Sequence, residues 1–218
     1  MFLTRKAQLV APEETLAGRS ERNFPLSERH RVLDAPLVTD PADIPEGYEV
    51  AFFGLGCFWG AEEIYWQVPG VWSTSVGYAG GTTPNPSYEE VCSGRTNHTE
   101  AVRIVFDPAR VSYADLVKTF FEVHDPTQGF RQGNDVGTQY RSAIYYTTPE
   151  QEQVARELTT VYAEELKRRR LGDVTTEIRP AADTPYYYAE DLHQQYLAKN
   201  PHGYRCHANT GVRFPETA

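Results

Sequence analysis

The sequence predicts an α+β fold: a two-layer α/β plait with a ferredoxin-like split βαβ core, an extended N-terminal arm and an irregular C-terminal tail. Two observations predict this class. Runs typical of strands and helices follow the order strand, helix, strand, strand, helix, strand, which is the order of a split βαβ plait. Segments with little periodicity precede and follow these runs. We therefore expect helices on one face of an antiparallel sheet.

The first four elements are predicted from apolar runs and from the glycine and proline residues that end them. Residues 50–55 form a continuous apolar run typical of a strand, and residues 58–67 continue as a helix. Residues 71–78 favour a second strand that ends before a Gly-Gly pair. Residues 101–106 alternate as a strand and stop at an Asp-Pro pair.

The later elements are predicted from helix caps and periodicity. Ser112 caps a helix that runs to Val123, and a strand is expected at 142–147. Thr148 followed by proline opens a helix through about Arg169, because proline suits the first helical position. A further strand at 174–178 and a short amphipathic helix at 189–199 complete the set.

The chain divides into three parts on this reading. Residues 1–47 are polar and contain five prolines, which predicts an extended arm without a core of its own. Residues 48–200 form the folded domain, and residues 201–218 are an irregular tail.

Composition and charge disfavour several classes of function. The net charge of -9 over 218 residues disfavours nucleic acid and anionic membranes as partners. No apolar run approaches the ~20 residues of a membrane helix, and the N-terminus shows no secretory signal. Cys57, Cys92 and Cys206 are too few for a disulfide scaffold and lack zinc-site spacing. We therefore expect a cytoplasmic protein without a metal.

The segment Gly56-Cys57-Phe58-Trp59-Gly60 is the strongest candidate site. It joins a predicted strand to a predicted helix, so the thiol of Cys57 is expected on the first helical turn. Free backbone N–H groups and the helix dipole favour a thiolate there. The two glycines are expected to turn the backbone and leave the sulfur uncovered, and the two aromatics to wall an apolar pocket. The alternative is a small buried core residue, the usual role of a lone cysteine.

Two polar loops, at 85–100 and 132–142, hold more polar and aromatic side chains than a simple connection needs. Loops carried on a rigid sheet are where sites usually form. Turn chemistry is the alternative for each.

These segments together identify a family. The chain resembles the peptide methionine sulfoxide reductases of the A type over about residues 48–200. The matching segments, in chain order, are Gly-Cys-Phe-Trp-Gly at 56–60, Gly-Tyr-Ala-Gly-Gly at 77–81, Tyr-Glu-Glu-Val-Cys-Ser-Gly at 88–94, His-Thr-Glu-Ala-Val at 98–102, Gln-Gly-Asn-Asp at 132–135, Gly-Thr-Gln-Tyr-Arg-Ser at 137–142 and Ala-Glu-Asp-Leu-His-Gln-Gln-Tyr-Leu at 189–197.

The resemblance implies reduction of the S epimer of methionine sulfoxide, free or in a peptide, by the domain at 48–200. Cys57 matches the nucleophile and Glu100 the acid that protonates the departing oxygen. The remaining matches are phenols that bind the sulfoxide oxygen, at Tyr88 and Tyr140, and a pocket for the S-methyl group, at Phe58 and Trp59. Asp135 matches a polar site residue with an orienting role, and a loop-closing Asx turn is its alternative.

The resemblance also implies how the enzyme is regenerated. Cys206, in the tail, matches a resolving cysteine that condenses with the Cys57 sulfenic acid. Since no cysteine follows it, we expect one disulfide, Cys57–Cys206, reduced directly by thioredoxin or a similar dithiol. Cys92 is interpreted as structural, with a resolving role as its alternative. No cofactor is expected, and the protein is expected to act as a monomer.

Three rival functions remain open at this point. A thiol peroxidase also uses a cysteine and a sulfenic acid, but it needs no apolar wall such as Phe58-Trp59. A sulfoxide-binding module without turnover would not need Glu100 or Cys206. A zinc protein is disfavoured because the cysteines are scattered.

Overall fold

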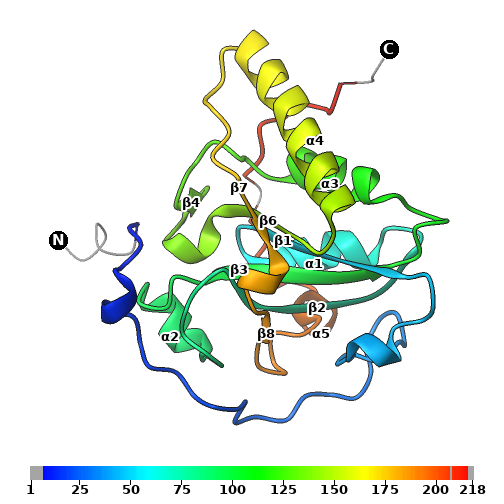
Figure 1. Cartoon of the computed structure of the whole chain (residues 1–218), viewed down its shortest axis with the longest axis vertical. Coiled ribbons are helices and arrows are strands. Elements are labelled where there is room, and N and C mark those ends of the chain that lie inside the picture. Colours follow the sequence, from blue (N-terminus) through cyan, green and yellow to red (C-terminus); the bar gives the residue numbers. More distant parts are fainter. Residues whose placement is uncertain (1–6, 207, 216–218) are drawn as a thin grey trace.

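The computed structural model describes residues 7–206 and 208–215 and is built around one mixed sheet of six strands in the order β7-β6-β1-β3-β2-β8 (Figure 1). The strands are β1 Glu49–Leu55, β2 Val71–Ala79, β3 Thr99–Phe106, β6 Ser142–Tyr146, β7 Glu177–Pro180 and β8 Tyr187–Tyr188. All neighbours are antiparallel except β6 and β7, which are parallel. The fold class is therefore mixed α/β. The expected antiparallel sheet covers the strands of the first six elements, and these strands, β6, β1, β3 and β2, are antiparallel neighbours. The later strand β7 is parallel to β6, because the chain passes through a long helix between them and so returns in the same direction.

Three helices longer than two turns lie in the described chain: α1 Phe58–Trp66, α3 Tyr113–Val123 and α4 Pro149–Arg168. The predicted caps of the last two are confirmed. The Ser112 hydroxyl accepts from the Asp115 N–H at 3.1 Å, and the Thr148 hydroxyl accepts from the Gln151 N–H at 3.2 Å. These bonds satisfy N–H groups that a helix start leaves free.

The helix expected at 189–199 is mostly wrong. Only α5, Tyr196–Lys199, is helical, and residues 191–195 form turns. Gln195 has a φ of 46° in the left-handed region, which interrupts any helix there. The amide of Gln194 instead bonds the backbone N–H and C=O of Val76 at 2.9 and 2.8 Å, which ties this segment to β2.

The two-residue edge strand β8 was not expected. Three other short elements were also not expected: the helix α2 Tyr88–Cys92 and the two-residue strands β4 Arg131–Gln132 and β5 Asp135–Val136, which pair with each other. They lie in the two polar loops. Each loop is therefore more regular than its composition indicates.

The main core lies between one face of the sheet and helices α1, α3 and α4. Phe53 of β1 is fully buried, and its ring lies 5.6 Å from Tyr65 of α1 and 5.4 Å from Phe120 of α3. Burial of one such side chain stabilises the fold by about 1.5–3 kcal/mol. This packing fixes the direction of α1, and with it the place of the residue where α1 begins.

The N-terminal segment from residue 7 to 47 runs as an extended chain along the opposite side of the molecule from α4 (Figure 1). Its only helical turns are the 3-10 turns Pro12–Glu14 and Pro41–Asp43. His30 is buried, and its Nε2 lies 2.7 Å from the Thr74 hydroxyl on β2. Arg19 forms two hydrogen bonds, 2.6 and 3.2 Å, with the carboxylate of Glu90 on α2. This segment therefore contacts both the sheet and a site loop.

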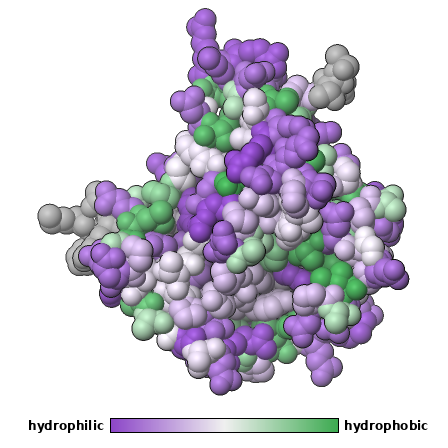
Figure 2. Space-filling model, in the orientation of Figure 1, coloured by the Kyte–Doolittle hydropathy of each residue, from purple (hydrophilic) through white to green (hydrophobic). Residues whose placement is uncertain are grey.

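No helix in the described ranges combines the length and the apolar composition that crossing a membrane requires. The longest, α4, projects from the sheet, and its free end is covered by hydrophilic residues (Figure 2).

Candidate active site

Cys57 lies at the junction between β1 and α1 and is the N-cap residue of the helix. Gly56 makes the turn: its φ is +93°, and a Cβ there would lie 2.7 Å from the Gln132 side chain. Only glycine fits both conditions. Gly60, by contrast, lies inside α1 with open space around it. One glycine of the pair turns the backbone, and the expectation that both do is wrong.

The sequence predicts that the sulfur of Cys57 is uncovered. This prediction is wrong, because the residue is only 9% exposed. Burial first, and the nearby Glu100 second, raise the thiol pKa well above its ordinary value. The N–H groups of Trp59 and Gly60 act in the opposite direction and lower it. The helix start therefore favours the thiolate as expected, but the desolvation of the sulfur outweighs it.

Glu100 lies on β3, opposite Tyr78 of β2, and is 2% exposed. Its Oε2 accepts the N–H of Phe58, the first residue of α1, at 3.0 Å. Burial, together with the charge of Asp135, raises the Glu100 pKa to about 8, against the opposing effect of the Phe58 N–H. At neutral pH the carboxyl therefore holds its proton beside the residue that follows Cys57.

Two half-buried phenols, Tyr88 on α2 and Tyr140 at the end of a 3-10 turn at Thr138–Tyr140, face the same region. Burial and then Glu100 raise the pKa of each, and Tyr140 is also affected by Tyr88. Both phenols keep their protons and can donate hydrogen bonds. The buried Arg141 holds the Tyr140 turn by donating to the Thr138 carbonyl at 2.8 Å.

Phe58 and Trp59 belong to an aromatic cluster at the start of α1. Phe58 is buried and stacks with Tyr88 at 6.5 Å. The Trp59 indole N–H donates to Nδ1 of His193 at 3.1 Å, and its ring stacks on Tyr196 at 3.8 Å. The ring of His193 lies 4.4 Å from that of Tyr88, so it joins both sides of the cluster. Sequence reasoning gave His193 no role, although it quoted the segment that contains it.

The tail residues Tyr204 and Cys206 both contact the β4–β5 pair. The phenol of Tyr204 donates to Asp135 Oδ2 at 3.1 Å, and the Cys206 thiol donates to the Gln132 carbonyl at 3.6 Å. Burial raises the pKa of Asp135. Tyr204 is a second residue that sequence reasoning missed, and its place in an irregular tail offered no pattern to find it.

None of the three cysteines is in a disulfide in this structure. Cys92 lies one turn after Tyr88 on α2 and, after burial and Glu100, helps to raise the pKa of the Tyr88 phenol. Within the described ranges, no three His, Cys, Asp or Glu side chains gather in a way that could hold a metal ion.

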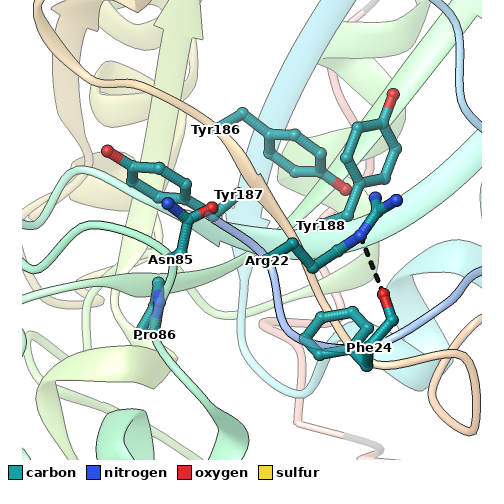
Figure 3. A pocket seen from close by; sticks show the side chains of 7 residues that line it. All are labelled: Arg22, Phe24, Asn85, Pro86, Tyr186, Tyr187 and Tyr188. Carbon is teal, nitrogen blue, oxygen red and sulfur yellow. Dashed lines mark hydrogen bonds between the residues drawn. The ribbon is translucent and has the colours of Figure 1, made fainter. Parts of the chain in front are cut away.

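A separate small pocket of about 80 Å³ lies between the N-terminal segment and β8 (Figure 3). Its lining residues are Arg22, Phe24, Asn85, Pro86, Tyr186, Tyr187 and Tyr188. It includes none of the predicted site residues and has room for only a few water molecules.

The geometry brings a nucleophilic sulfur and a carboxyl that holds its proton to one end of α1, between two phenols and an aromatic wall. A protein with these groups can pass an oxygen from a substrate to a thiol, which is the chemistry of a thiol-dependent oxidoreductase.

Comparison with known proteins defines the class further. A family model described as peptide methionine sulfoxide reductase matches residues 49–217. The peptide methionine sulfoxide reductase MsrA of Salinispora arenicola is 57% identical over 218 residues, which cover 99% of this chain and 96% of that protein. The corresponding MsrA 1 of Synechocystis is 54% identical over 211 residues, 97% of this chain and 92% of that protein.

Solved structures agree. Methionine sulfoxide reductase A of Corynebacterium diphtheriae superimposes with a TM-score of 0.84 at 52% identity, over 96% of this chain and 100% of that one. Mxr1 from Saccharomyces cerevisiae in its reduced form gives a TM-score of 0.67 at 32% identity, over 78% and 93% of the two chains. The chain therefore belongs to the peptide methionine sulfoxide reductase family, and it is an oxidoreductase that reduces methionine sulfoxide.

Proposed function

We propose that this chain reduces the S epimer of methionine sulfoxide, free or in a polypeptide, with Cys57 as nucleophile and Glu100 as acid, and so repairs oxidised proteins. The observation that carries the proposal is the 3.0 Å bond from the Phe58 N–H to Glu100 Oε2. It holds a protonated carboxyl against the residue next to Cys57. One group can then attack the sulfoxide sulfur while the other protonates its oxygen.

In the first step the sulfur of Cys57 attacks the substrate sulfur. Overall, oxygen passes from the substrate to Cys57, two electrons pass the other way, and the thiol becomes a sulfenic acid as methionine leaves. The raised pKa values of Cys57 and Glu100 keep both groups uncharged near neutrality, which suits an uncharged substrate. The N–H groups of Trp59 and Gly60 stabilise the thiolate as it forms.

The phenols of Tyr88 and Tyr140 hydrogen-bond the sulfoxide oxygen and stabilise the negative charge that develops on it. Phe58 and Trp59 hold the S-methyl group, through apolar fit and contacts between sulfur and the aromatic rings worth about 0.3–1.5 kcal/mol each. His193 fixes the Trp59 ring through its hydrogen bond. Asp135 orients the site and raises the pKa of the acid.

In the second step the Cys206 thiol attacks the sulfenic acid. The S–S bond forms as the S–O bond of Cys57 breaks, and the oxygen leaves as water. Thioredoxin or a similar dithiol then reduces the Cys57–Cys206 disulfide, because residues 207–218 contain no cysteine that could relay it. The cycle uses thiols alone and takes no prosthetic group.

The proposal extends to the organisation of the chain. Residues 48–200 are the catalytic domain, 1–47 an arm and 201–218 the tail that carries the resolving cysteine. The order β6-β1-β3-β2, antiparallel throughout, supports a split βαβ plait at the core. The protein acts as a monomer in the cytoplasm. Three cysteines in 218 residues, without the pattern of a disulfide scaffold, support a reducing compartment.

Mass spectrometry after a single turnover tests the proposal. The reduced protein receives one equivalent of S-epimer N-acetylmethionine sulfoxide without reductant. We expect one equivalent of N-acetylmethionine and a disulfide that maps to Cys57 and Cys206. Cys57→Ser should yield no methionine, Cys206→Ser should stop at the sulfenic acid, and Cys92→Ser should behave as wild type.

Turnover by Cys57→Ser with dithiothreitol would contradict the assignment of the nucleophile. Faster oxidation of Cys57 by hydrogen peroxide than by the sulfoxide would favour a thiol peroxidase instead. Binding of the sulfoxide without any methionine produced would favour a binding module.

A further inference from the structure

Arg205, directly before Cys206, is held on α1. Its Nε and one terminal nitrogen contact the two carboxylate oxygens of Glu63 at 2.6 and 2.7 Å, in a bidentate pair. Its other terminal nitrogen donates to the carbonyls of Pro201 and Gly203 at 2.9 and 3.2 Å. The guanidinium therefore fixes the conformation of residues 201–205, directly before the thiol, and holds this segment against α1.

Glu63 belongs to α1, the helix whose N-cap is Cys57. It lies six residues further on, or roughly 9 Å along the helix axis at 1.5 Å per residue. The tail is thus bound to the same rigid element that presents the sulfur to be attacked. Tyr204 gives the tail a second contact, on β5: its phenol donates to Asp135 Oδ2 at 3.1 Å, and burial together with this bond raises the pKa of the phenol.

The chain after Cys206 is anchored again. The Tyr162 phenol on α4 lies 2.7 Å from the Thr210 hydroxyl and donates to the Val212 carbonyl at 3.0 Å. The Phe214 ring is buried and stacks on Tyr162 at 5.6 Å. Arg205 and Thr210 are five positions apart in the sequence.

Gln132 lies between the two thiols. Its carbonyl accepts from Cys206, and its side chain packs against Gly56, the neighbour of Cys57. Cys206 must leave this carbonyl to reach the sulfenic acid. A thiol on a short segment with fixed ends has a much higher effective concentration at its target than one on a free tail.

We propose that Arg205 and Glu63 are positioning residues for the resolving step, which hold Cys206 beside the Cys57 end of α1 so that it attacks the sulfenic acid. The inference rests on the proposed function and adds to it the ion pair that sets the rate of disulfide formation. Neither residue contacts the sulfoxide site, so the first step does not depend on them.

Rapid-quench single turnovers test the pair. Wild-type protein in excess reacts with S-epimer N-acetylmethionine sulfoxide without reductant. Product is followed by chromatography, and the Cys57 sulfenic acid by dimedone trapping and mass spectrometry. In Arg205→Gln we expect product to form at the wild-type rate and the sulfenic acid to decay roughly 10-fold or more slowly, because a misplaced reacting group can cost about 100-fold.

Three further variants make the result specific. Arg205→Lys keeps the charge but not the bidentate pair, so it should be intermediate. The exchanged pair Glu63→Arg with Arg205→Glu should restore part of the rate that either single substitution loses. Arg213→Gln, which removes an exposed tail arginine near Glu122, is the matched control and should resolve at the wild-type rate.

Decay of the sulfenic acid at the wild-type rate in Arg205→Gln would overturn the proposal, as would an equal slowing of product formation. Failure of the wild type to make any methionine would instead refute the proposed function.

Discussion

The backbone N–H of Phe58 donates to Oε2 of Glu100 over 3.0 Å, which joins the first residue of α1 to the middle strand that carries the acid. Three N–H groups of the first helical turn are thereby divided between two functional groups. That of Phe58 meets the carboxyl, and those of Trp59 and Gly60 act on the Cys57 sulfur. The N–H groups at a helix N-terminus ordinarily bind an anion. Here they face the Cys57 thiol and the Glu100 carboxyl, whose raised pKa values keep both uncharged near neutral pH.

The pH profile of the first step should reveal Glu100. Its pKa is raised to about 8, so the proton is present at neutral pH and is lost as the pH rises through 8. The single-turnover rate of the wild type should therefore fall above about pH 8. In Glu100→Gln the rate at pH 7 should drop by about 100- to 10,000-fold, and the alkaline fall should disappear because only the thiol still titrates. A wild-type profile in the variant would exclude Glu100 as the acid.

Replacement of Asp135 by asparagine should move that profile. The negative charge of Asp135 raises the pKa of Glu100, so its removal makes the acid ionise more easily. We expect the alkaline fall of Asp135→Asn to begin at lower pH than in the wild type. The exposed Asp173→Asn is the control and should leave the profile in place; a shift toward higher pH in Asp135→Asn would have the wrong sign.

The two phenols should contribute to the rate more than to binding. Tyr88→Phe and Tyr140→Phe each remove one donor to the developing charge, and each should lower kcat by about 10- to 100-fold, with a larger loss in the double variant. KM should change little. Steady-state kinetics with a dithiol reductant measure both constants, and Tyr146→Phe serves as the remote control. A change in KM alone would assign the phenols to substrate binding.

The N-terminal segment should stabilise the domain. His30 is buried, its Nε2 contacts the Thr74 hydroxyl, and its Nδ1 accepts the N–H groups of Val32 and Leu33 at 3.1 and 3.0 Å. His30→Ala should lower the free energy of unfolding in urea by about 2–4 kcal/mol, through lost hydrogen bonds and a cavity. Val32→Ala, at a side chain that is 46% exposed, should change it little. Equal effects from the two would mean that the segment is only loosely attached.

Local patterns in the sequence predicted the elements well where the interactions that form them are local. The caps at Ser112 and Thr148 depend on residues three positions apart, and the strand at β1 on a continuous apolar run. The helix expected at 189–199 was wrong because Gln194 bonds β2, more than a hundred residues away in the chain. A pattern within residues 189–199 cannot indicate this contact with Val76 of β2.

The sequence by itself determined the family and the candidates for the nucleophile, the acid and the phenols, because each belongs to a short ordered motif. Tertiary structure alone decided the state of these groups. Gln132 packs over Gly56, the Cys57 sulfur is buried, and Glu100 is enclosed beside Phe58, so the pKa values of thiol and carboxyl both rise. It also decided which residues contact the candidate site, namely His193, against Trp59 and Tyr88, and Tyr204, against Asp135. Desolvation and long-range contacts arise only when distant segments pack together, and for this reason the sequence could name the reacting atoms but not their protonation.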